Sequence, residues 1–255
     1  MEKNIYAVYF SPTYTSKKNA ISIAKEFSDN YTEIDMTILS KKPNISEFTE
    51  NDIVIFAGPV YGGRLYKDFA EKLKTLKGNK TPCILTVTYG NRDFDDALLE
   101  MKDVVESVGF VPFAGAAVLG EHTYGKIGIG RPDESDLKKN ADFAKKAMQK
   151  FKEGNFDVKI PGNKPYRDGG SGGKFTPLTD KNLCSNCGWC YENCPVGAIS
   201  KDDYSVIDSN KCIACFRCIK NCPSNAKNMD TPEYNKFAVD FTKKLAKRCE
   251  NKYFL

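Results

Sequence analysis

Cysteine spacing constrains this chain more than any other feature of its sequence. Eight of the ten cysteines fall into two runs of one pattern, and the second run follows the first by 28 positions, as Cys212 follows Cys184. The runs are Cys184-x2-Cys187-x2-Cys190-x3-Cys194-Pro195 and Cys212-x2-Cys215-x2-Cys218-x3-Cys222-Pro223. Three closely spaced thiolates can wrap one corner of a 4Fe-4S cubane, and a distant fourth thiolate closes it. The spacing therefore predicts the ligands of two 4Fe-4S clusters.

In this spacing the fourth cysteine of each run serves the other run's cluster. We expect cluster I to be held by Cys184, Cys187, Cys190 and Cys222, and cluster II by Cys212, Cys215, Cys218 and Cys194. A zinc ribbon would leave the third and fourth cysteine of each run without a role. A disulfide scaffold is typical of small secreted domains, whereas this chain has 255 residues. Cys83 and Cys249 lie outside the pattern and are interpreted as buried or idle thiols.

The repeat extends beyond the cysteines. Asn182 matches Asn210, Asn193 matches Asn221, and Ala198 matches Ala226 at the same offset. With its prolines after the fourth cysteines, this segment, 177–232, resembles the bacterial two-cluster ferredoxin family. Five large side chains interleave the cysteines, and we expect the aromatic ones to shield the clusters and the cations to form a docking face: Trp189, Tyr191, Phe216, Arg217 and Lys220.

Composition and charge exclude several other classes of protein. The chain is 41% hydrophobic and 28% charged, and no apolar run approaches the ~18 residues that span a bilayer. The formal net charge of +5 counts the cysteines as neutral. Because each oxidised cluster with its thiolates carries about −2, a loaded protein would be near neutral. We therefore expect no nucleic-acid partner and no membrane insertion, and a cytoplasmic location that keeps thiols reduced.

The first 151 residues alternate strand and helix signals. Short apolar runs predict strands at 5–10, 31–39, 53–57, 83–88 and 111–118, and apolar residues recur at helical spacing between them. A last helix is entered through the Pro132-Asp133 turn. Five strands alternating with helices predict an α/β fold with a doubly wound parallel sheet.

Three loops that follow predicted strands are suited to bind a ligand, since such sheets bind at the carboxyl ends of their strands. The first, 11–16, carries four hydroxyl side chains immediately before a helix, where backbone N–H groups favour phosphate. The same hydroxyls are also ordinary helix caps. The other two loops, 58–64 and 88–93, pair glycines with a tyrosine that can cover a ring.

These loops resemble those of the flavodoxin family, and the resemblance implies that FMN binds through its phosphate and both faces of its ring. The implied cofactor-binding residues are Ser11, Thr13, Tyr14, Thr15, Ser16, Pro59, Val60, Tyr61, Gly62, Gly63, Arg64, Thr88, Tyr89, Gly90, Asn91 and Arg92. This chain departs from the family's Ser-x-Thr-Gly-Asn-Thr loop, because Tyr14 replaces the glycine and Thr15 the asparagine. An empty, flavodoxin-like domain is the alternative.

Three charged or titratable residues are candidates for tuning the flavin. His122, the single histidine, follows the last predicted strand and is a candidate for catalytic proton transfer; a structural role is the alternative. Arg64 and Arg92 either tune the flavin potential or are solvated rim charges.

The order of the regions resembles the ferredoxin/flavodoxin fusion family of anaerobic prokaryotes. We expect a domain at 1–151, a glycine- and proline-rich linker at 152–176, the ferredoxin domain at 177–232 and a C-terminal helix at 233–255. The expected function is electron transfer between two 4Fe-4S clusters and FMN, in an oxidoreductase with redox partner proteins and a small-molecule acceptor at the flavin. A pure electron carrier and a redox sensor or assembly component remain alternatives, and the oligomeric state is not predicted.

Overall fold

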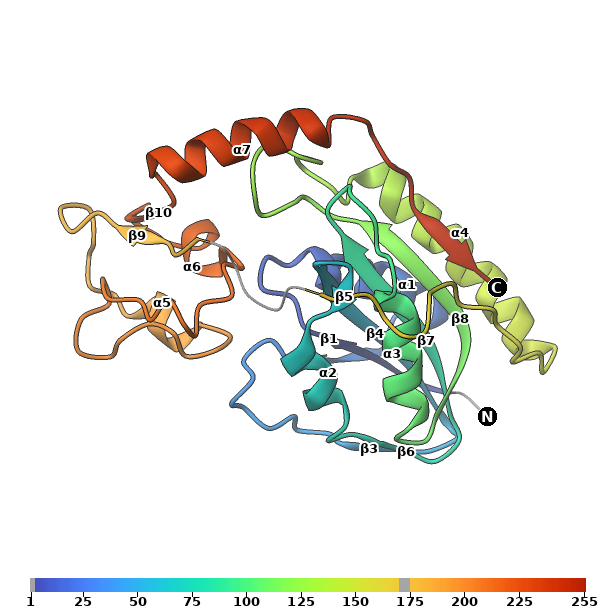
Figure 1. Ribbon diagram of the computed structural model, residues 1–255. Coiled ribbons are helices and arrows are strands. Elements are labelled where there is room, and N and C mark those ends of the chain that lie inside the picture. Colours follow the sequence, from blue (N-terminus) through green and yellow to red (C-terminus); the bar gives the residue numbers. More distant parts are fainter. Residues whose placement is uncertain (1–2, 170–174) are drawn as a thin grey trace.

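A mostly parallel sheet forms the centre of the molecule (Figure 1). The computed structural model describes residues 3–169 and 175–255. Five parallel strands lie in the order β2 (Tyr31–Asp35), β1 (Asn4–Tyr9), β4 (Asp52–Tyr61), β7 (Thr81–Tyr89) and β8 (Phe110–Leu119). Counted along the chain this order is 2-1-3-4-5, that of a flavodoxin-like doubly wound sheet. The predicted fold class is confirmed.

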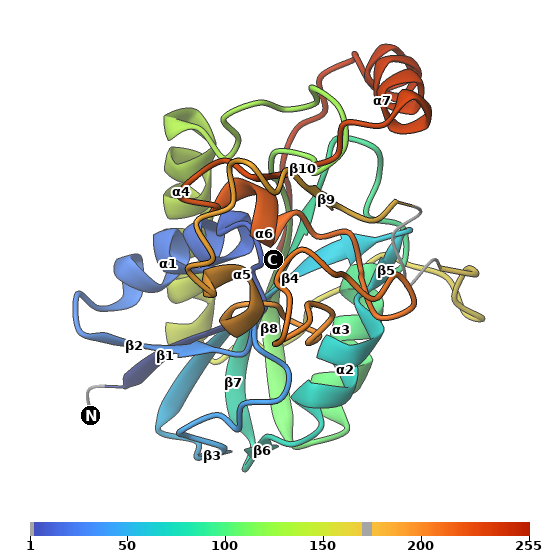
Figure 2. The same cartoon turned by 90° about the vertical axis from the view of Figure 1, so that its left-hand side faces the viewer.

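Helices cover both faces of this sheet, as Figure 2 shows. One face carries α1 (Thr15–Phe27) and α4 (Glu134–Lys152), and the other carries α2 (Lys67–Leu73) and α3 (Ala97–Glu106). Helix α4 begins at the predicted turn, where Asp133 and Asp136 form a reciprocal capping box. The short strands β3 (Glu47–Phe48), β5 (Arg64–Leu65) and β6 (Lys77–Gly78) lie beside the main ladder.

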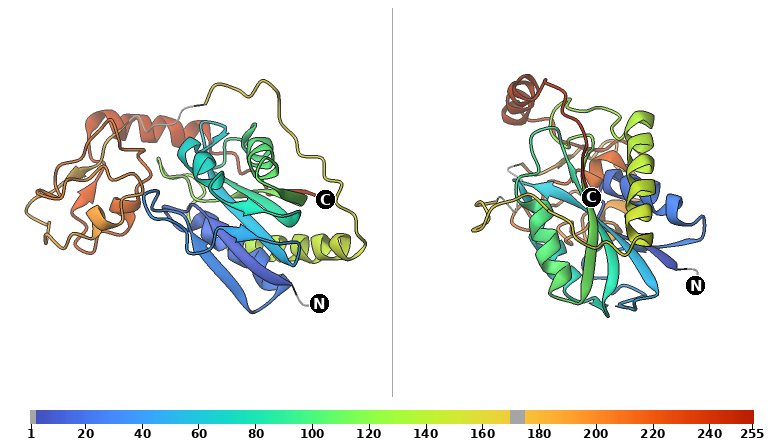
Figure 3. Two further views of the ribbon diagram at one scale, coloured as in Figure 1. Left: turned by 90° about the horizontal axis from the view of Figure 1, so that it is seen from below. Right: turned by 90° about the vertical axis from the view of Figure 1, so that its right-hand side faces the viewer.

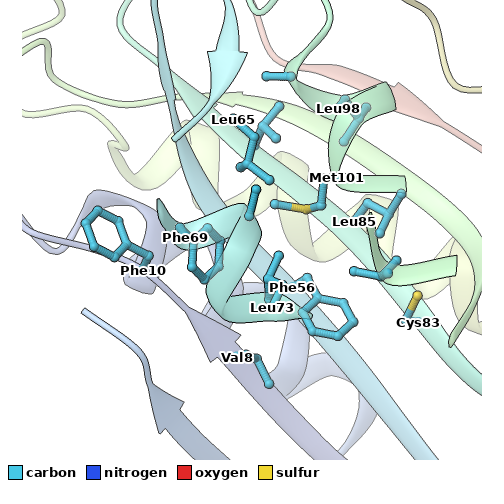
Figure 4. Packing of buried hydrophobic residues seen from close by; sticks show 14 of the residues in the cluster. Val8, Phe10, Phe56, Leu65, Phe69, Leu73, Cys83, Leu85, Leu98 and Met101 are labelled. Atoms are coloured by element: carbon cyan, nitrogen blue, oxygen red, sulfur yellow. The ribbon is translucent and has the colours of Figure 1, made fainter. Parts of the chain in front are cut away.

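Two apolar cores hold these layers together, one on each face of the sheet. Under α2 and α3 the aromatic side chains of Phe56 and Phe69 are fully buried (Figure 4). Under α1 and α4 the second core includes Ile23 and Phe113. Burial on both faces explains why the strands read as nearly continuous apolar runs in the sequence.

The C-terminal segment differs from the single helix predicted over 233–255. Helix α7 spans Pro232–Lys244 and ends before the predicted helix does. The chain then forms β11 (Lys252–Phe254), which pairs antiparallel with β8. The Asn91 amide donates to the carbonyls of Leu245 and Lys247 at 2.8 Å each. These bonds hold the segment extended, so the predicted helix is wrong beyond Lys244.

The predicted linker is pinned to the sheet rather than free. The described residues from 155 to 169 form no helix or strand and run along the face of α3 toward the cysteine-rich region (Figure 3). Asp96 accepts hydrogen bonds from the backbone N–H groups of Asn163 at 2.8 Å and Arg167 at 2.7 Å. Most of the predicted flexible tract, Gly170 to Gly173, lies outside the described residues.

The cysteine-rich region lies beyond the carboxyl ends of the sheet strands, and α7 spans from it back toward the sheet (Figure 1). It contains β9 (Leu178–Thr179), β10 (Lys227–Asn228), and one-turn helices α5 (Trp189–Glu192) and α6 (Arg217–Lys220). Among the described residues, no helix is long and apolar enough to cross a membrane.

Internal symmetry in this region follows the 28-residue repeat. The side chains of Asn193 and Asn221 each donate to the carbonyl four residues earlier, at 3.0 and 2.9 Å. Asp180 N–H donates to the Ala226 carbonyl at 2.9 Å, and Asp208 N–H donates to the Ala198 carbonyl at 2.8 Å. Each copy therefore completes the other, as expected of a duplicated unit.

Candidate functional site

Two small cavities bring the eight patterned cysteines together in the predicted sets. The outer cavity is lined by Cys184, Cys187, Cys190 and Cys222, and the inner cavity by Cys212, Cys215, Cys218 and Cys194. In the part of the chain that the structure describes, no three His, Cys, Asp or Glu side chains converge as the ligands of a single metal ion would. Four cysteines spread around one cavity match a cubane rather than a mononuclear site.

Backbone amides point at the sulfurs. Ala198 and Ala226 donate their N–H groups to Sγ of Cys194 and Cys222, both at 3.2 Å, and Ala214 donates to Sγ of Cys212 at 3.4 Å. Such bonds stabilise thiolates, the form that binds iron. Burial raises the pKa of Cys215 to about 12, so this sulfur stays a thiol at neutral pH unless a metal replaces its proton.

The two cavities differ in exposure. Cys187 of the outer cavity is exposed, whereas Cys215 of the inner cavity is buried. The inner cavity also faces the sheet domain, since Ile213 packs against the core under α2 and α3. The outer cavity is therefore the more exposed of the two.

A third cavity, a cleft of about 210 Å³, opens at the carboxyl ends of β1, β4, β7 and β8. Ten of the residues predicted to bind a flavin line it: Thr13, Thr15, Ser16, Pro59, Val60, Tyr61, Gly62, Thr88, Tyr89 and Gly90. His122 lines it as well. The three predicted loops thus converge on one cleft.

The first loop has the features of an anion site. Ser16 is buried at the start of α1, and its Oγ has no hydrogen-bond partner among the described residues. Tyr14 adopts the left-handed conformation, with φ of 66°, that glycine would favour. The guanidinium of Arg217 lies 5.3 Å from the Tyr14 ring centroid and helps to hold this conformation. An unpaired hydroxyl at the N-terminus of a 13-residue helix fits a phosphate oxygen.

Six predicted residues do not line the cleft: Ser11, Tyr14, Gly63, Arg64, Asn91 and Arg92. Arg64 instead forms a two-pronged ion pair with Glu100, both N–O distances being 2.8 Å. Arg92 pairs with Asp95, and Asn91 binds the C-terminal segment. Closer polar partners hold the side chains of Arg64, Arg92 and Asn91, so a flavin contact of these three residues stays a prediction.

Seven lining residues were missed: Pro12, Gly120, Glu121, Thr123, Tyr124, Ile213 and Ala214. The segment after β8 supplies four of them, from Gly120 to Tyr124. In this segment the sequence pointed only to His122, as the single histidine. Ile213 and Ala214 come from between two cysteines of the second run. One signal was available for them: Ile213 and Ala214 replace Ser185 and Asn186 of the first run, so the second run is more apolar there.

His122 is held as a neutral imidazole. Its Nδ1 accepts the Tyr124 N–H at 2.8 Å, which places the proton on Nε2. Burial lowers its pKa to about 4, and the positive charge of Arg92 contributes in the same direction. At neutral pH this side chain is therefore a hydrogen-bond donor rather than a base.

Comparisons with known proteins agree with this division. A family model described as a 4Fe-4S dicluster domain matches residues 183–226. The chain is 28% identical over 141 residues to an uncharacterized protein of Methanocaldococcus jannaschii, an alignment that covers 52% of this chain and 91% of that protein.

Solved flavodoxins are similar over the sheet domain. An archaeal flavodoxin aligns with a TM-score of 0.40 and 14% identity, covering 58% of this chain and 99% of its own. A Fusobacterium nucleatum flavodoxin bound to flavin mononucleotide aligns with a TM-score of 0.41 and 14% identity, covering 58% and 98%. The strand order already defines the fold, and the chain thus joins a flavodoxin-like domain to a 4Fe-4S dicluster domain, the arrangement of a flavodoxin–ferredoxin fusion. The dicluster domain supports a role in iron–sulfur electron transfer.

Proposed function

We propose that this protein passes electrons between two 4Fe-4S clusters, held in the outer and inner cavities with crossed ligation, and an FMN held in the cleft. A donor protein reduces the clusters, and the flavin reduces an acceptor, so that the chain is a ferredoxin-wired oxidoreductase of the cytoplasm. The proposed domains are 1–151 and 177–232, joined by 152–176. FMN supplies the junction between one-electron and two-electron chemistry.

One loop carries this proposal. Ile213 lines both the inner cavity and the cleft, and its neighbour Ala214 lines the cleft. The flanking Cys212 and Cys215 line the inner cavity. A cluster in the inner cavity and a ring in the cleft would thus be separated by a single loop of the chain.

The cleft residues fit a flavin in shape and chemistry. A Cβ at Gly90 would lie 2.3 Å from Cδ2 of His122, and one at Gly120 would lie 2.6 Å from Cγ2 of Thr88. Glycine at these positions keeps the walls close without closing the cleft. The Ser16 hydroxyl supplies the unpaired donor for phosphate, and Ile213 with Ala214 excludes water from the side toward the clusters.

The neutral His122 has a role that differs from proton abstraction. Its protonated Nε2 supplies one N–H donor beside the cleft, and its Nδ1 is fixed by the Tyr124 amide. A fixed donor can stabilise negative charge that develops on a bound ring without transferring a proton.

Anaerobic reconstitution followed by stopped-flow reduction tests the proposal. We expect about eight irons and one FMN per chain, and flavin bleaching after dithionite reduces the clusters. The rate constant should be independent of protein concentration, because the transfer is intramolecular. Flavin that stays oxidised while the clusters are reduced would contradict the proposal.

A pure electron carrier is the second candidate, because Ile213 and Ala214 occupy one wall of the cleft. A flavin ring covered on this side can exchange electrons with the inner cluster, but it leaves less room for a bulky substrate. The carrier is favoured if the reduced flavin is reoxidised by a flavodoxin-sized redox protein but by no small acceptor.

A further inference from the structure

Two buried cations lie beside the cysteine cavities without a carboxylate partner. Lys227 is 3% exposed and lines the outer cavity; Arg217 is 6% exposed and lines the inner cavity. Neither takes part in any ion pair among the described residues, although 17 such contacts link other side chains. Among the described residues, these two buried charges therefore have no carboxylate to balance them.

Neutral oxygens hold each cation in place. Lys227 Nζ donates to Thr179 Oγ1 at 2.7 Å and to the Tyr204 carbonyl. Arg217 Nη1 donates to the Pro12 carbonyl at 3.0 Å, while its Nε has no partner. Removing a charge from water costs several kcal/mol unless an opposite charge compensates it. Since carbonyl dipoles compensate only in part, an anion is required near each cation.

The repeat shows that these cations are not a shared feature of the two copies. At the offset of 28, Lys227 corresponds to Ile199, and Arg217 corresponds to Trp189. Each cavity has thus acquired its cation at a different position of the unit. The duplicated fold does not require a cation at either position, because the other copy has an apolar side chain there. We infer that the positive charge itself has a function beside each cavity.

We propose that Lys227 and Arg217 are the resident counter-charges of the outer and inner clusters, and that each raises the reduction potential of its own cluster. The inference rests on the proposed occupancy of the cavities by 4Fe-4S clusters. On reduction a cluster gains one electron, taken from dithionite in the test below, and therefore one negative charge. A cation fixed in a low-dielectric site stabilises that added charge. Arg217 also binds the loop at Pro12, so it joins the inner cluster to the anion site of the cleft.

The test compares two variants, each of which lacks one of the two buried charges, and measures both clusters in each. In Arg217→Met and Lys227→Met the charge is lost while most of the side-chain volume is kept. Potentiometric titration followed by electron paramagnetic resonance measures both clusters in each variant. Cys187→Ala and Cys215→Ala assign the two signals, since each removes a ligand from one cavity only.

We expect Arg217→Met to lower the reduction equilibrium constant of the inner cluster at least tenfold, which is about 59 mV for one electron, and to change the outer cluster less. Lys227→Met should show the opposite pattern. Lys220→Met is the matched control: Lys220 lies one turn from Arg217 on α6, but it is exposed and paired with Glu121 at 2.6 Å. It should shift neither cluster as much.

The charge-preserving variants Arg217→Lys and Lys227→Arg complete the design. They should keep the parental potentials, and they give the readout if a methionine variant fails to retain iron. Equal shifts of both clusters, or shifts no larger than those of Lys220→Met, would overturn the inference. Parental protein that binds no iron would instead reject the proposed function itself, so the two failures are distinguishable.

Discussion

The sheet domain and the cysteine-rich region achieve stability in different ways. The sheet buries two apolar cores, in which large side chains such as Phe56 and Phe113 are fully enclosed. The cysteine-rich region has one small cluster of buried residues, Ala214, Phe216 and Met229, and Tyr124 of the sheet domain packs against it. A region of this size with so little core needs a metal or another cross-link to fold. The sheet domain thus folds by packing, whereas we expect folding of the cysteine-rich region to depend on iron.

Loss of iron tests this contrast most strongly. Anaerobic chelation should unfold the cysteine-rich region, because four sulfurs around each cavity then lose the group that joins them. Hydrogen exchange should show lost protection from β9 to β10 and retained protection in β1, β4 and β7. Retained protection of α5 and α6 without iron would show that the cysteine-rich region folds without its clusters. Cys249→Ser, outside both cavities, should leave the iron content unchanged.

A large-to-small substitution in the core should destabilise the sheet domain rather than the cysteine-rich region. Phe56 is fully buried, and its ring centroid lies 4.9 Å from that of Phe110. Phe56→Ala should lower the free energy of unfolding of the sheet domain by about 3–5 kcal/mol. Denaturant unfolding followed by circular dichroism measures this loss, and the single tryptophan, Trp189, reports the cysteine-rich region separately by fluorescence. An equal shift in both signals would mean that the regions unfold as one unit.

Titration of His122 gives a third, smaller effect, located at the junction of the two regions. Burial lowers the pKa of His122 to about 4 in the folded chain, below its ordinary value of about 6.5. Between these values the unfolded chain binds a proton that the folded chain does not, so stability is complete above pH 6.5 and falls as the pH falls toward 4. The loss is at most about 3 kcal/mol.

The control for this titration is His122→Gln, which keeps a polar side chain but cannot titrate. Its stability, measured by denaturant unfolding at several pH values, should depend less on pH between 4 and 6.5. The same slope in both proteins would assign the pH dependence to other groups. Flavin affinity of His122→Gln at pH 7 should change little if the phosphate loop carries most of the binding.

Backbone strain gives the smallest predicted effect, at a position where the two copies of the repeat carry different residues. Gly188 has φ of 75°, and its counterpart in the second copy, Phe216, has φ of 60°. Phe216 packs against Tyr124 and Tyr234, whereas a Cβ added at Gly188 would lie 3.1 Å from the Tyr204 hydroxyl. Gly188→Ala should cost about 1–2 kcal/mol, measured as a lower denaturant midpoint of the Trp189 signal. No change would show that the first copy relaxes freely.

Local patterns predicted the sheet well because the central strands β4, β7 and β8 bury both faces and the helices show apolar stripes. The run at Ile53 and the stripe at Ala97 and Met101 are examples, and they lie in the two cores. Strand β11 could not be predicted, because Lys252–Phe254 is too short to show a period. Its conformation depends on β8 and on Asn91, which are distant in sequence.

The candidate site was predictable where chemistry and spacing coincide. The cysteine sets were predicted together because the run itself determines which sulfurs can meet. The ion pair of Arg64 with Glu100, on α3, could not be predicted, because no local pattern reveals a partner 36 residues away. Ile213 and Ala214 were missed because their role depends on how one region docks on the other.

Pairing of β11 with β8 gives the cysteine-rich region the topology of an insertion rather than of a tail. Both of its ends return to the same sheet, by the 155–169 segment and by α7 with β11. During synthesis the five parallel strands leave the ribosome first and can fold before the cysteines emerge. The last strand emerges only after both cysteine runs. Closure of this sheet edge by β11 therefore follows the synthesis of both cysteine runs.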